Sequence, residues 1–247
     1  MKTILFPLIT AAALLTGSVR AQNEYAEIAR LRGLNESVRG IRSMADGEHY
    51  TTLESNDIVR YSYASAAPGE SMLPAPAPNL VITDYAFSPD SRRIAYLRFD
   101  ESEVPLMEMM RFDGKLYNRA YSFKYPKAGE RNSVVQLWIA DLETGARERI
   151  DTGEETDQYI PRIGWTPDGR PWYYRLNRRQ NTFEMIVCEP HGAQRTVYEE
   201  RAQQYVERVD DGTVTFVDRD RFLVRQESHT GFMHLYLYSL RRGILEQ

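Results

Sequence analysis

Three pairs of glutamates have the spacing most suited to chemistry. Glu101 and Glu103 flank Ser102, while Glu154–Glu155 and Glu199–Glu200 are adjacent pairs. Residues two apart on a strand share a face, so Glu101 and Glu103 could hold an amine or a cation that offsets their mutual repulsion. We favour the simpler interpretation that both are solvated or hydrogen-bonded structural residues. The two adjacent pairs lie in turn-like contexts and are expected to be surface charge.

Cys188 is the only cysteine in the sequence, so it can form neither an intrachain disulfide nor a cysteine-based metal site. It lies in the apolar run Phe183–Glu189, and no histidine stands nearby in a recognisable signature. This context favours a buried strand residue over a nucleophile. His229 and His234 are five residues apart, which places them on opposite faces of a strand, so a shared metal is not expected.

The remaining polar candidates are better explained by turns. Ser88 and Asp90 belong to a Ser-Pro-Asp sequence typical of a tight turn, and His49 stands near a turn without an identifiable partner. The sequence contains no Gly-x-Ser-x-Gly nucleophile elbow. We therefore predict no catalytic, substrate-binding or metal-binding residue in this chain, and no cofactor.

A repeated pattern of aromatic residue, turn and strand indicates the architecture. Phe87-Ser-Pro-Asp-Ser matches Trp165-Thr-Pro-Asp-Gly, and more degenerate copies begin at Phe216 and Met44. In each copy a buried aromatic residue ends one strand, proline and aspartate make the turn, and a second strand follows. The tryptophans of these strands are expected in the core between blades rather than in a peptide groove: Trp138, Trp165 and Trp172.

A second turn follows three of the copies, within residues 139–145, 187–192 and 237–243. This spacing predicts four-stranded antiparallel blades and therefore an all-β fold, a partial β-propeller, rather than unrelated hairpins in a sandwich. Residues 100–131 are an insertion within one blade. Residues 64–79, rich in proline and alanine, predict an exposed loop or linker, and residues 24–34 a short helix.

The first residues have the pattern of an export signal. Lys2 supplies the positive start, Ile4–Leu15 is an apolar run too short to span a bilayer, and Ser18–Ala21 offers small residues to a signal peptidase. We expect residues 1–21 to be removed, and no later stretch predicts a membrane span. Removal takes away Lys2 and Arg20 and no acid, so the formal net charge shifts from -4 to -6.

This balance of charge gives no electrostatic reason to bind nucleic acid or an anionic membrane. The paired arginines, Arg178–Arg179 and Arg241–Arg242, are expected to be solvated turn residues. Export without disulfides suits the periplasm of a Gram-negative envelope, where we expect the protein to lie.

Four stretches, in this order, resemble the dipeptidyl peptidase IV family of serine exopeptidases: Ser43–Tyr50, Phe87–Pro105, Tyr125–Gly129 and Trp165–Asn181. The resemblance covers most of residues 24–240. It implies an N-terminal eight-bladed propeller and a C-terminal α/β-hydrolase domain with a Ser-Asp-His triad. It also implies the release of dipeptides that have proline or alanine at the penultimate position. In the family, adjacent glutamates and an arginine of the propeller hold the substrate amine.

The sequence departs from that pattern in three ways. It stops at Gln247 without the hydrolase domain, and Thr83–Phe87 joins an early blade directly to a later one. The shortening near Asp84–Tyr85 falls where the amine-binding residues would lie. Four blades also do not close a ring of eight, which exposes strand edges.

We therefore expect residues 22–247 to be a propeller fragment of an exported dipeptidyl peptidase IV-like serine exopeptidase, not catalytic by itself. Its expected partners are peptides in the full-length family and a hydrolase domain or a second propeller part. The alternative is a stand-alone periplasmic scaffold that binds peptides or proteins.

Overall fold

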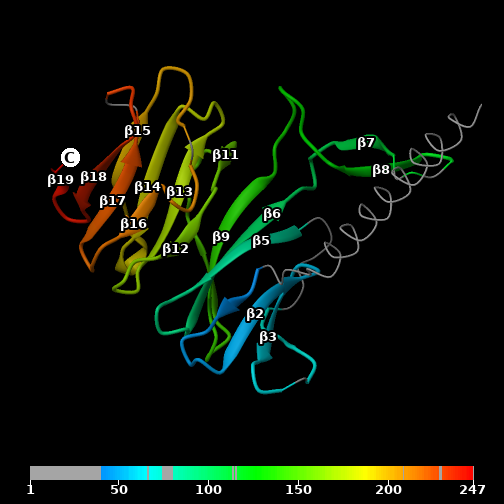
Figure 1. The fold of residues 1–247 in the computed structure, drawn as a ribbon, viewed down its shortest axis with the longest axis horizontal. Helices are drawn as coiled ribbons and strands as arrows, with labels where there is room; N and C mark the ends of the chain where they lie inside the picture. Colours follow the sequence, from blue (N-terminus) through cyan, green and yellow to red (C-terminus); the bar gives the residue numbers. More distant parts are fainter. Residues whose placement is uncertain are drawn as a thin grey trace, which may run out of the picture. The chain divides into compact units, whose positions relative to one another are not determined.

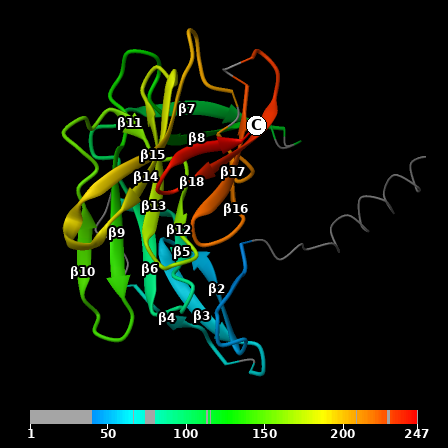
Figure 2. The same ribbon diagram turned by 90° about the vertical axis from the view of Figure 1, so that its left-hand side faces the viewer.

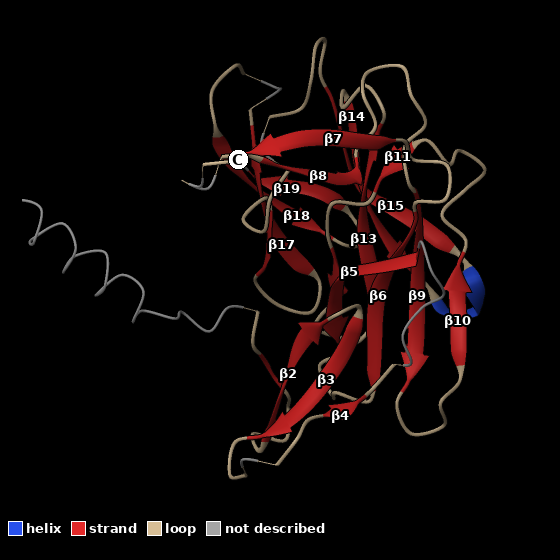
Figure 3. Cartoon of the chain, turned by 90° about the vertical axis from the view of Figure 1, so that its right-hand side faces the viewer, coloured by secondary structure: helices blue, strands red, loops and turns tan. Residues whose placement is uncertain are grey.

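The computed structural model describes residues 40–65, 67–73, 80–112, 114, 116–207, 209–227 and 230–246. Within this part nearly all regular structure is β, and the single helix is the short 3-10 turn η1 (Pro190–Gly192) (Figure 3). The strands form four antiparallel sheets and one separate hairpin. We call the four sheets blades A to D in chain order. The expected signal peptide and the helix over residues 24–34 lie outside the described residues.

Each blade is a meander of consecutive antiparallel strands (Figures 1 and 2). Blade A contains β1 (Arg42–Ser43), β2 (His49–Glu54), β3 (Asp57–Ser62) and β4 (Glu70–Ser71). Blade B contains β5 (Leu80–Phe87), β6 (Arg93–Asp100), β9 (Val134–Asp141) and β10 (Arg147–Ile150). The insertion between β6 and β9 forms the hairpin of β7 (Leu106–Arg111) and β8 (Arg119–Lys124).

The two later blades repeat this order. Blade C contains β11 (Gln158–Tyr159), β12 (Ile163–Trp165), β13 (Pro171–Asn177), β14 (Thr182–Cys188) and β15 (Gln194–Arg201). Both β11 and β12 pair with β13, so they act as one interrupted first strand. Blade D contains β16 (Val214–Phe216), β17 (Arg221–Gln226), β18 (His234–Ser239) and β19 (Gly243–Glu246). The predicted four-stranded antiparallel blades are therefore confirmed.

The repeated turns have the predicted chemistry. In blade B the hydroxyl of Ser88 donates to Asp90 at 2.6 Å, and the same carboxylate accepts the Arg92 N–H at 3.1 Å. In blade C the hydroxyl of Thr166 bonds Asp168 in the same way, and the Arg170 N–H donates to that hydroxyl at 2.9 Å. These short side chains satisfy backbone donors that the tight turn leaves unpaired.

The blades have two distinct edges. The turns between first and second strands and between third and fourth strands lie at one edge, which we call the turn edge. The links between second and third strands and the passages from blade to blade lie at the opposite edge, the connection edge. The β7–β8 insertion leaves blade B at its connection edge.

Packing between blades explains the apolar run in the middle of strand β6. Along β6, Ile94 and Tyr96 face blade A, while Ala95 and Leu97 face blade C. Successive side chains of a strand point to opposite faces, so a sheet buried on both sides needs apolar residues at every position. Within the described residues the A–B, B–C and C–D seams each have a buried cluster, which includes Ile58 and Tyr85, Leu137 and Tyr173, and Phe183 and Phe222, respectively.

One expectation about the region before blade B changes. The proposed loop over residues 64–79 contains strand β4, which pairs with β3, and Leu73, which is only 3% exposed. Residues 83–87 lie within the continuous strand β5, which has an irregularity between Ile82 and Tyr85. Leu73 belongs to the same buried cluster as Ile58 and Ile82, so this described part of the expected linker lies in the A–B seam.

Candidate functional site

An apolar pocket of about 370 Å³ lies between blades B and C at their connection edge. Blade B contributes Phe99 and Val135. The remaining lining residues come from blade C and from its passage to blade D: Tyr159, Ile160, Pro161, Leu176, Gln180, Val206 and Val209. Aromatic and branched side chains dominate this lining, which suits an apolar side chain or ring.

Hydrogen bonds of the main chain fix the wall formed by the β13–β14 turn. The carbonyl oxygen of the Asn177 side chain accepts the N–H groups of Asn181 and Thr182 at 3.0 and 3.1 Å. The Val206 N–H donates to the Gln180 carbonyl at 2.7 Å, which ties the passage to blade D onto the same turn. The pocket is thus bounded by loops that are hydrogen-bonded to each other.

Arg178 contacts Tyr159, one of the lining residues, and is therefore not simply the solvated turn residue that the sequence suggested. Its guanidinium lies 5.6 Å from the centre of the Tyr159 ring and donates to the Tyr159 hydroxyl at 2.8 Å. Asp157 lies 3.8 Å from the same guanidinium. The contact with Tyr159 spans 19 residues of sequence, so local turn patterns do not reveal it.

The lining contains no serine, cysteine, histidine or carboxylate. Its one titratable side chain is Tyr159, whose hydroxyl accepts a hydrogen bond from Arg178. The lining therefore suits the binding of an apolar group.

Glu101 and Glu103 lie near this edge but not on a strand. They follow the end of β6 in a turn, where the Val104 N–H donates to the Glu101 carbonyl at 3.1 Å. Glu103 is exposed and forms an ion pair with Arg131. The expectation of a shared strand face is wrong because β6 ends at Asp100. The structure shows Glu103 in the solvated role that we favoured.

Both adjacent glutamate pairs were predicted to be surface charge, and the structure confirms this for the first pair but not for the second. Glu154 and Glu155 are exposed in a loop. Glu200, however, lies on β15 and is only 7% exposed, with its carboxylate accepting the Tyr198 hydroxyl at 2.8 Å. The prediction of surface charge is wrong here because Glu200 falls on the buried face of an eight-residue strand, not in a turn.

Cys188 is buried on β14, as predicted. Burial, aided by the nearby charges of Glu189 and Glu148, raises the pKa of its thiol to about 12. A thiol that stays protonated near neutral pH is a poor nucleophile. His49 does have a partner, since its Nδ1 lies 2.8 Å from Asp46 across the β1–β2 turn.

The tryptophans belong to the seams between blades, as expected. The Trp165 ring nitrogen donates to the Ala86 carbonyl of blade B at 2.9 Å. Trp172 of blade C packs near Phe216 of blade D, with ring centres 6.4 Å apart. Trp138 packs against the A–B cluster. These contacts join neighbouring blades and leave the three rings little freedom to form a groove.

The described part of the chain contains no cluster of three or more His, Cys, Asp or Glu side chains able to hold a metal ion. None of its helices has the length and apolar character needed to cross a bilayer.

The consecutive four-stranded blades, packed face to face with an insertion in the second, define this part of the chain as a β-propeller. The sequence profile described as the dipeptidyl peptidase IV (DPP IV) N-terminal region matches residues 82–246. The chain therefore belongs to the dipeptidyl peptidase IV family, through the N-terminal propeller region of that family, as its sequence motifs indicated.

Known proteins with similar sequence or structure agree. The crystal structure of Porphyromonas gingivalis dipeptidyl peptidase 4 superimposes with a TM-score of 0.71 and 26% identity, covering 84% of this chain and 31% of that one. Inactive dipeptidyl peptidase 10 of Rattus norvegicus is 32% identical over 161 residues, which are 62% of this chain and 20% of that protein. Dipeptidyl peptidase 4 of Arthroderma otae is 26% identical over 178 residues, 64% of this chain and 22% of that protein. The chain thus spans about a fifth of the length of these curated relatives.

Proposed function

We propose that this chain is the substrate-positioning propeller part of an exported dipeptidyl peptidase IV-like serine exopeptidase and does not hydrolyse peptides by itself. The observation that carries the proposal is the apolar pocket at the connection edge, which can hold an apolar ring and has no serine, cysteine, histidine or carboxylate in its lining. Family membership and relatives named dipeptidyl peptidase 4 support the peptidase context.

The chemistry of peptide hydrolysis supports a division of labour. Attack on the peptide carbonyl needs a nucleophile activated by a base, together with donors for the oxyanion. Among the described residues Ser88 is buried in a turn and Cys188 is buried on a strand. A serine, histidine and oxyanion hole would therefore come from a hydrolase domain, whether in the same protein or in a partner.

The role of this chain would be to bind the apolar part of a peptide. Phe99, Tyr159 and Pro161 give the pocket rigid walls that suit the ring of a proline or the methyl group of an alanine. Burying each methylene is worth about 0.8 kcal/mol, so a proline is favoured over a small polar residue.

Export is part of the proposal and is supported by sequence. Lys2, the apolar run Ile4–Leu15 and the small residues of Ser18–Ala21 have the order of a cleaved signal. We place the mature protein in the periplasm of a Gram-negative cell, where peptides are available as ligands. Sequencing the N-terminus of the protein recovered from a periplasmic extract tests this, and a start at Gln22 is expected.

Binding by the purified chain tests the positioning role. Isothermal titration with the amidated tetrapeptides Ala-Pro-Ala-Ala and Ala-Asp-Ala-Ala is expected to show binding of the first and at least tenfold weaker binding of the second. Val209→Phe, which fills the pocket, is expected to abolish the preference. Val217→Phe is the matched control, because Val217 is 51% exposed and lies outside the pocket. Equal binding of both peptides, or loss with the control alone, would contradict the proposal.

A stand-alone binding scaffold is the second candidate, and the β7–β8 hairpin favours it. Figure 1 shows this hairpin standing away from the sheet of blade B. Large apolar side chains on it and beside it are exposed: Leu106, Met109, Met110, Phe112, Leu116, Tyr117, Tyr121 and Tyr125. Exposed apolar patches of this kind mark sites of protein contact. Light scattering coupled to size exclusion separates the candidates, since a defined complex with a non-catalytic partner would favour the scaffold.

A further inference from the structure

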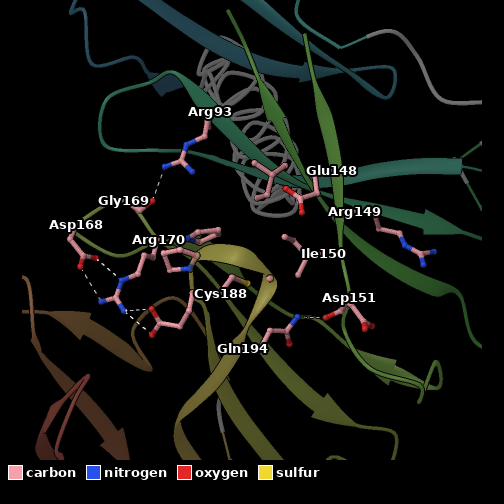
Figure 4. Close-up of a pocket in the computed structure, with 15 residues that line it drawn as sticks. Arg93, Glu148, Arg149, Ile150, Asp151, Asp168, Gly169, Arg170, Cys188 and Gln194 are labelled. Carbon is pink, nitrogen blue, oxygen red and sulfur yellow. Dashed lines mark hydrogen bonds and ion pairs between the residues drawn. The ribbon is translucent and has the colours of Figure 1, made fainter. Parts of the chain in front are cut away.

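A second, larger pocket lies between blades B and C at the turn edge, opposite the apolar pocket. Its volume is about 660 Å³. Its lining includes the apolar residues Ile139, Ile150, Pro171 and Cys188. Figure 4 shows charged side chains around Ile150 and Cys188. A concave site with an apolar base and a few polar groups has the general character of a small-molecule site.

Most charges around this pocket neutralise each other. Arg170 pairs with Asp168 at 3.0 Å and with Glu189 at 2.9 Å, and Glu189 also pairs with Arg195 at 2.8 Å. Figure 4 shows Arg170 turned toward Asp168 and away from the open centre. This network joins two turns of blade C, and it leaves neither sign of charge in excess for a ligand.

Arg93 differs from Arg170 because no carboxylate of the described residues forms an ion pair with it. Its guanidinium lies 4.6 Å from the centre of the Trp165 ring and donates through one nitrogen to the Gly169 carbonyl at 2.8 Å. The charge of Arg93 helps to lower the pKa of Asp90 and of Asp141, but both carboxylates accept hydrogen bonds within their own turns. Arg93 is thus a fixed cation at one wall with donors left for an anion.

Glu148 provides the opposite charge on the same face of blade B, on β10, two strands away from Arg93 on β6. In the β9–β10 ladder Glu148 is paired with Ile139 and Ile150 with Leu137, and directly opposed residues share a face. Ile139 and Leu137 face blade C, so Glu148 and Ile150 face the pocket as well. Figure 4 shows Glu148 directed inward, whereas Arg149 points away. No ion pair to the Glu148 carboxylate occurs among the described residues.

We propose that this pocket binds a small zwitterion of dipeptide size, with both termini free and an apolar side chain. The carboxylate of the ligand would pair with Arg93, its ammonium group with Glu148, and its side chain would cover Ile139, Ile150 and Cys188. The site is distinct from the apolar pocket at the connection edge and does not rest on the peptidase proposal.

Blocking each terminus of the ligand in turn tests the assignment. Isothermal titration of the purified chain with the dipeptide Ala-Leu is expected to give saturable binding. N-acetyl-Ala-Leu and Ala-Leu-amide are each expected to bind at least tenfold more weakly, because each lacks one charged contact. No binding of Ala-Leu, or equal binding of the three, would overturn the proposal.

Variants then assign the two charges. Glu148→Gln is expected to remove the preference for a free ammonium group, while Glu143→Gln, an exposed glutamate in the β9–β10 turn, keeps it. Arg93→Gln is expected to remove the preference for a free carboxylate, with Arg92→Gln as its control. If Arg93→Gln fails to fold, the ligand selectivity of Glu148→Gln alone tests the proposal. Glu148 is exposed, so its substitution is expected to leave the fold intact. Unchanged selectivity in Glu148→Gln would overturn the proposal. Val209→Phe is expected to leave dipeptide binding unchanged, which separates this site from the other pocket.

Discussion

The hydroxyl of Thr51 in blade A lies 3.0 Å from the hydroxyl of Tyr85 in blade B, and both side chains are buried. Arg42 adds a second contact across the same seam, since its guanidinium lies 4.4 Å from the centre of the Tyr85 ring and bonds Asp84 at 2.6 Å. Blade A therefore packs directly on blade B across the region where the sequence suggested a shortening. The seam has the same kind of apolar cluster as the B–C and C–D seams.

This relationship predicts that the Tyr85 hydroxyl contributes to stability. Tyr85→Phe leaves the Thr51 hydroxyl without that partner and is expected to lower the free energy of unfolding by about 1 kcal/mol. Tyr63→Phe is the matched control, because its hydroxyl bonds Ser43 at an exposed site and its loss is expected to cost less than about 0.5 kcal/mol. Urea denaturation followed by circular dichroism measures both. Equal effects would mean that the A–B seam is not buried in solution.

A glycine in blade C is predicted to be essential for packing. A Cβ atom at Gly164 would lie 2.5 Å from the Trp172 ring, which is closer than van der Waals contact allows. Gly164→Ala is therefore expected to destabilise the chain by about 1–3 kcal/mol. Adding Trp172→Leu to this variant is expected to recover part of the lost stability. Denaturation of the wild type, the two single variants and the double variant completes a double-mutant cycle and gives the coupling energy between the two positions. Additive effects would show that the Trp172 ring does not lie against Gly164.

Acid is predicted to weaken the turn edge of blade C. Burial opposes ionisation of Asp168 and Glu189, but hydrogen bonds from Thr166 and Arg170 to Asp168, and from Arg195 and Arg170 to Glu189, lower the pKa of each. The pKa values of these two carboxyls are lower in the folded chain than in the unfolded chain, so their ionised forms stabilise the fold. This contribution to the free energy of unfolding is complete above the unfolded pKa and is lost as pH falls through the folded pKa. Unfolding titrations between about pH 5 and pH 2 are expected to show falling stability, with a shallower slope in Asp168→Asn. An unchanged slope would argue against the network.

Cys188 is predicted to be unreactive in the folded chain. Its pKa of about 12 keeps the thiol protonated at pH 8, and only 6% of its surface is exposed. A disulfide reagent such as DTNB is expected to react with less than one tenth of the thiol in the native protein within an hour, and with all of it in guanidinium chloride. Because the pKa of this thiol is higher in the folded chain than in the unfolded chain, the unfolded chain loses the proton first. The free energy of unfolding is therefore expected to decline as pH rises past about 9. Rapid labelling of the native protein would place the thiol at an accessible surface.

The sequence was sufficient to predict the features that depend on local chemistry. Ser88 and Asp90 make a turn through bonds that span only a few residues, and the same pattern recurs at Thr166. Repetition of that turn also revealed the blades, because each copy marks the same pair of strands. The apolar run Ile94–Leu97 in the middle of β6 agrees with a sheet buried on both faces.

The individual contacts and pockets between blades, unlike the placement of the tryptophans, were not predictable from the sequence. The bond from Arg93 to Gly169 spans 76 residues and joins two blades at the turn edge. Glu200 was assigned to a turn because nothing local shows that β15 continues to Arg201 or which of its faces is buried. Both pockets lie at the seam between blades B and C, so no single motif contains either of them.

The most direct test of the central claim is hydrolysis of Ala-Pro-p-nitroanilide by the purified chain, with a known dipeptidyl peptidase 4 as the positive control. We predict no release of p-nitroaniline above the blank and no labelling by a fluorophosphonate that reacts with activated serines, in a preparation that binds the Ala-Pro-Ala-Ala amide. Release that saturates with substrate, scales with protein concentration and disappears with fluorophosphonate labelling of this chain would contradict the claim that it positions substrate without catalysing hydrolysis.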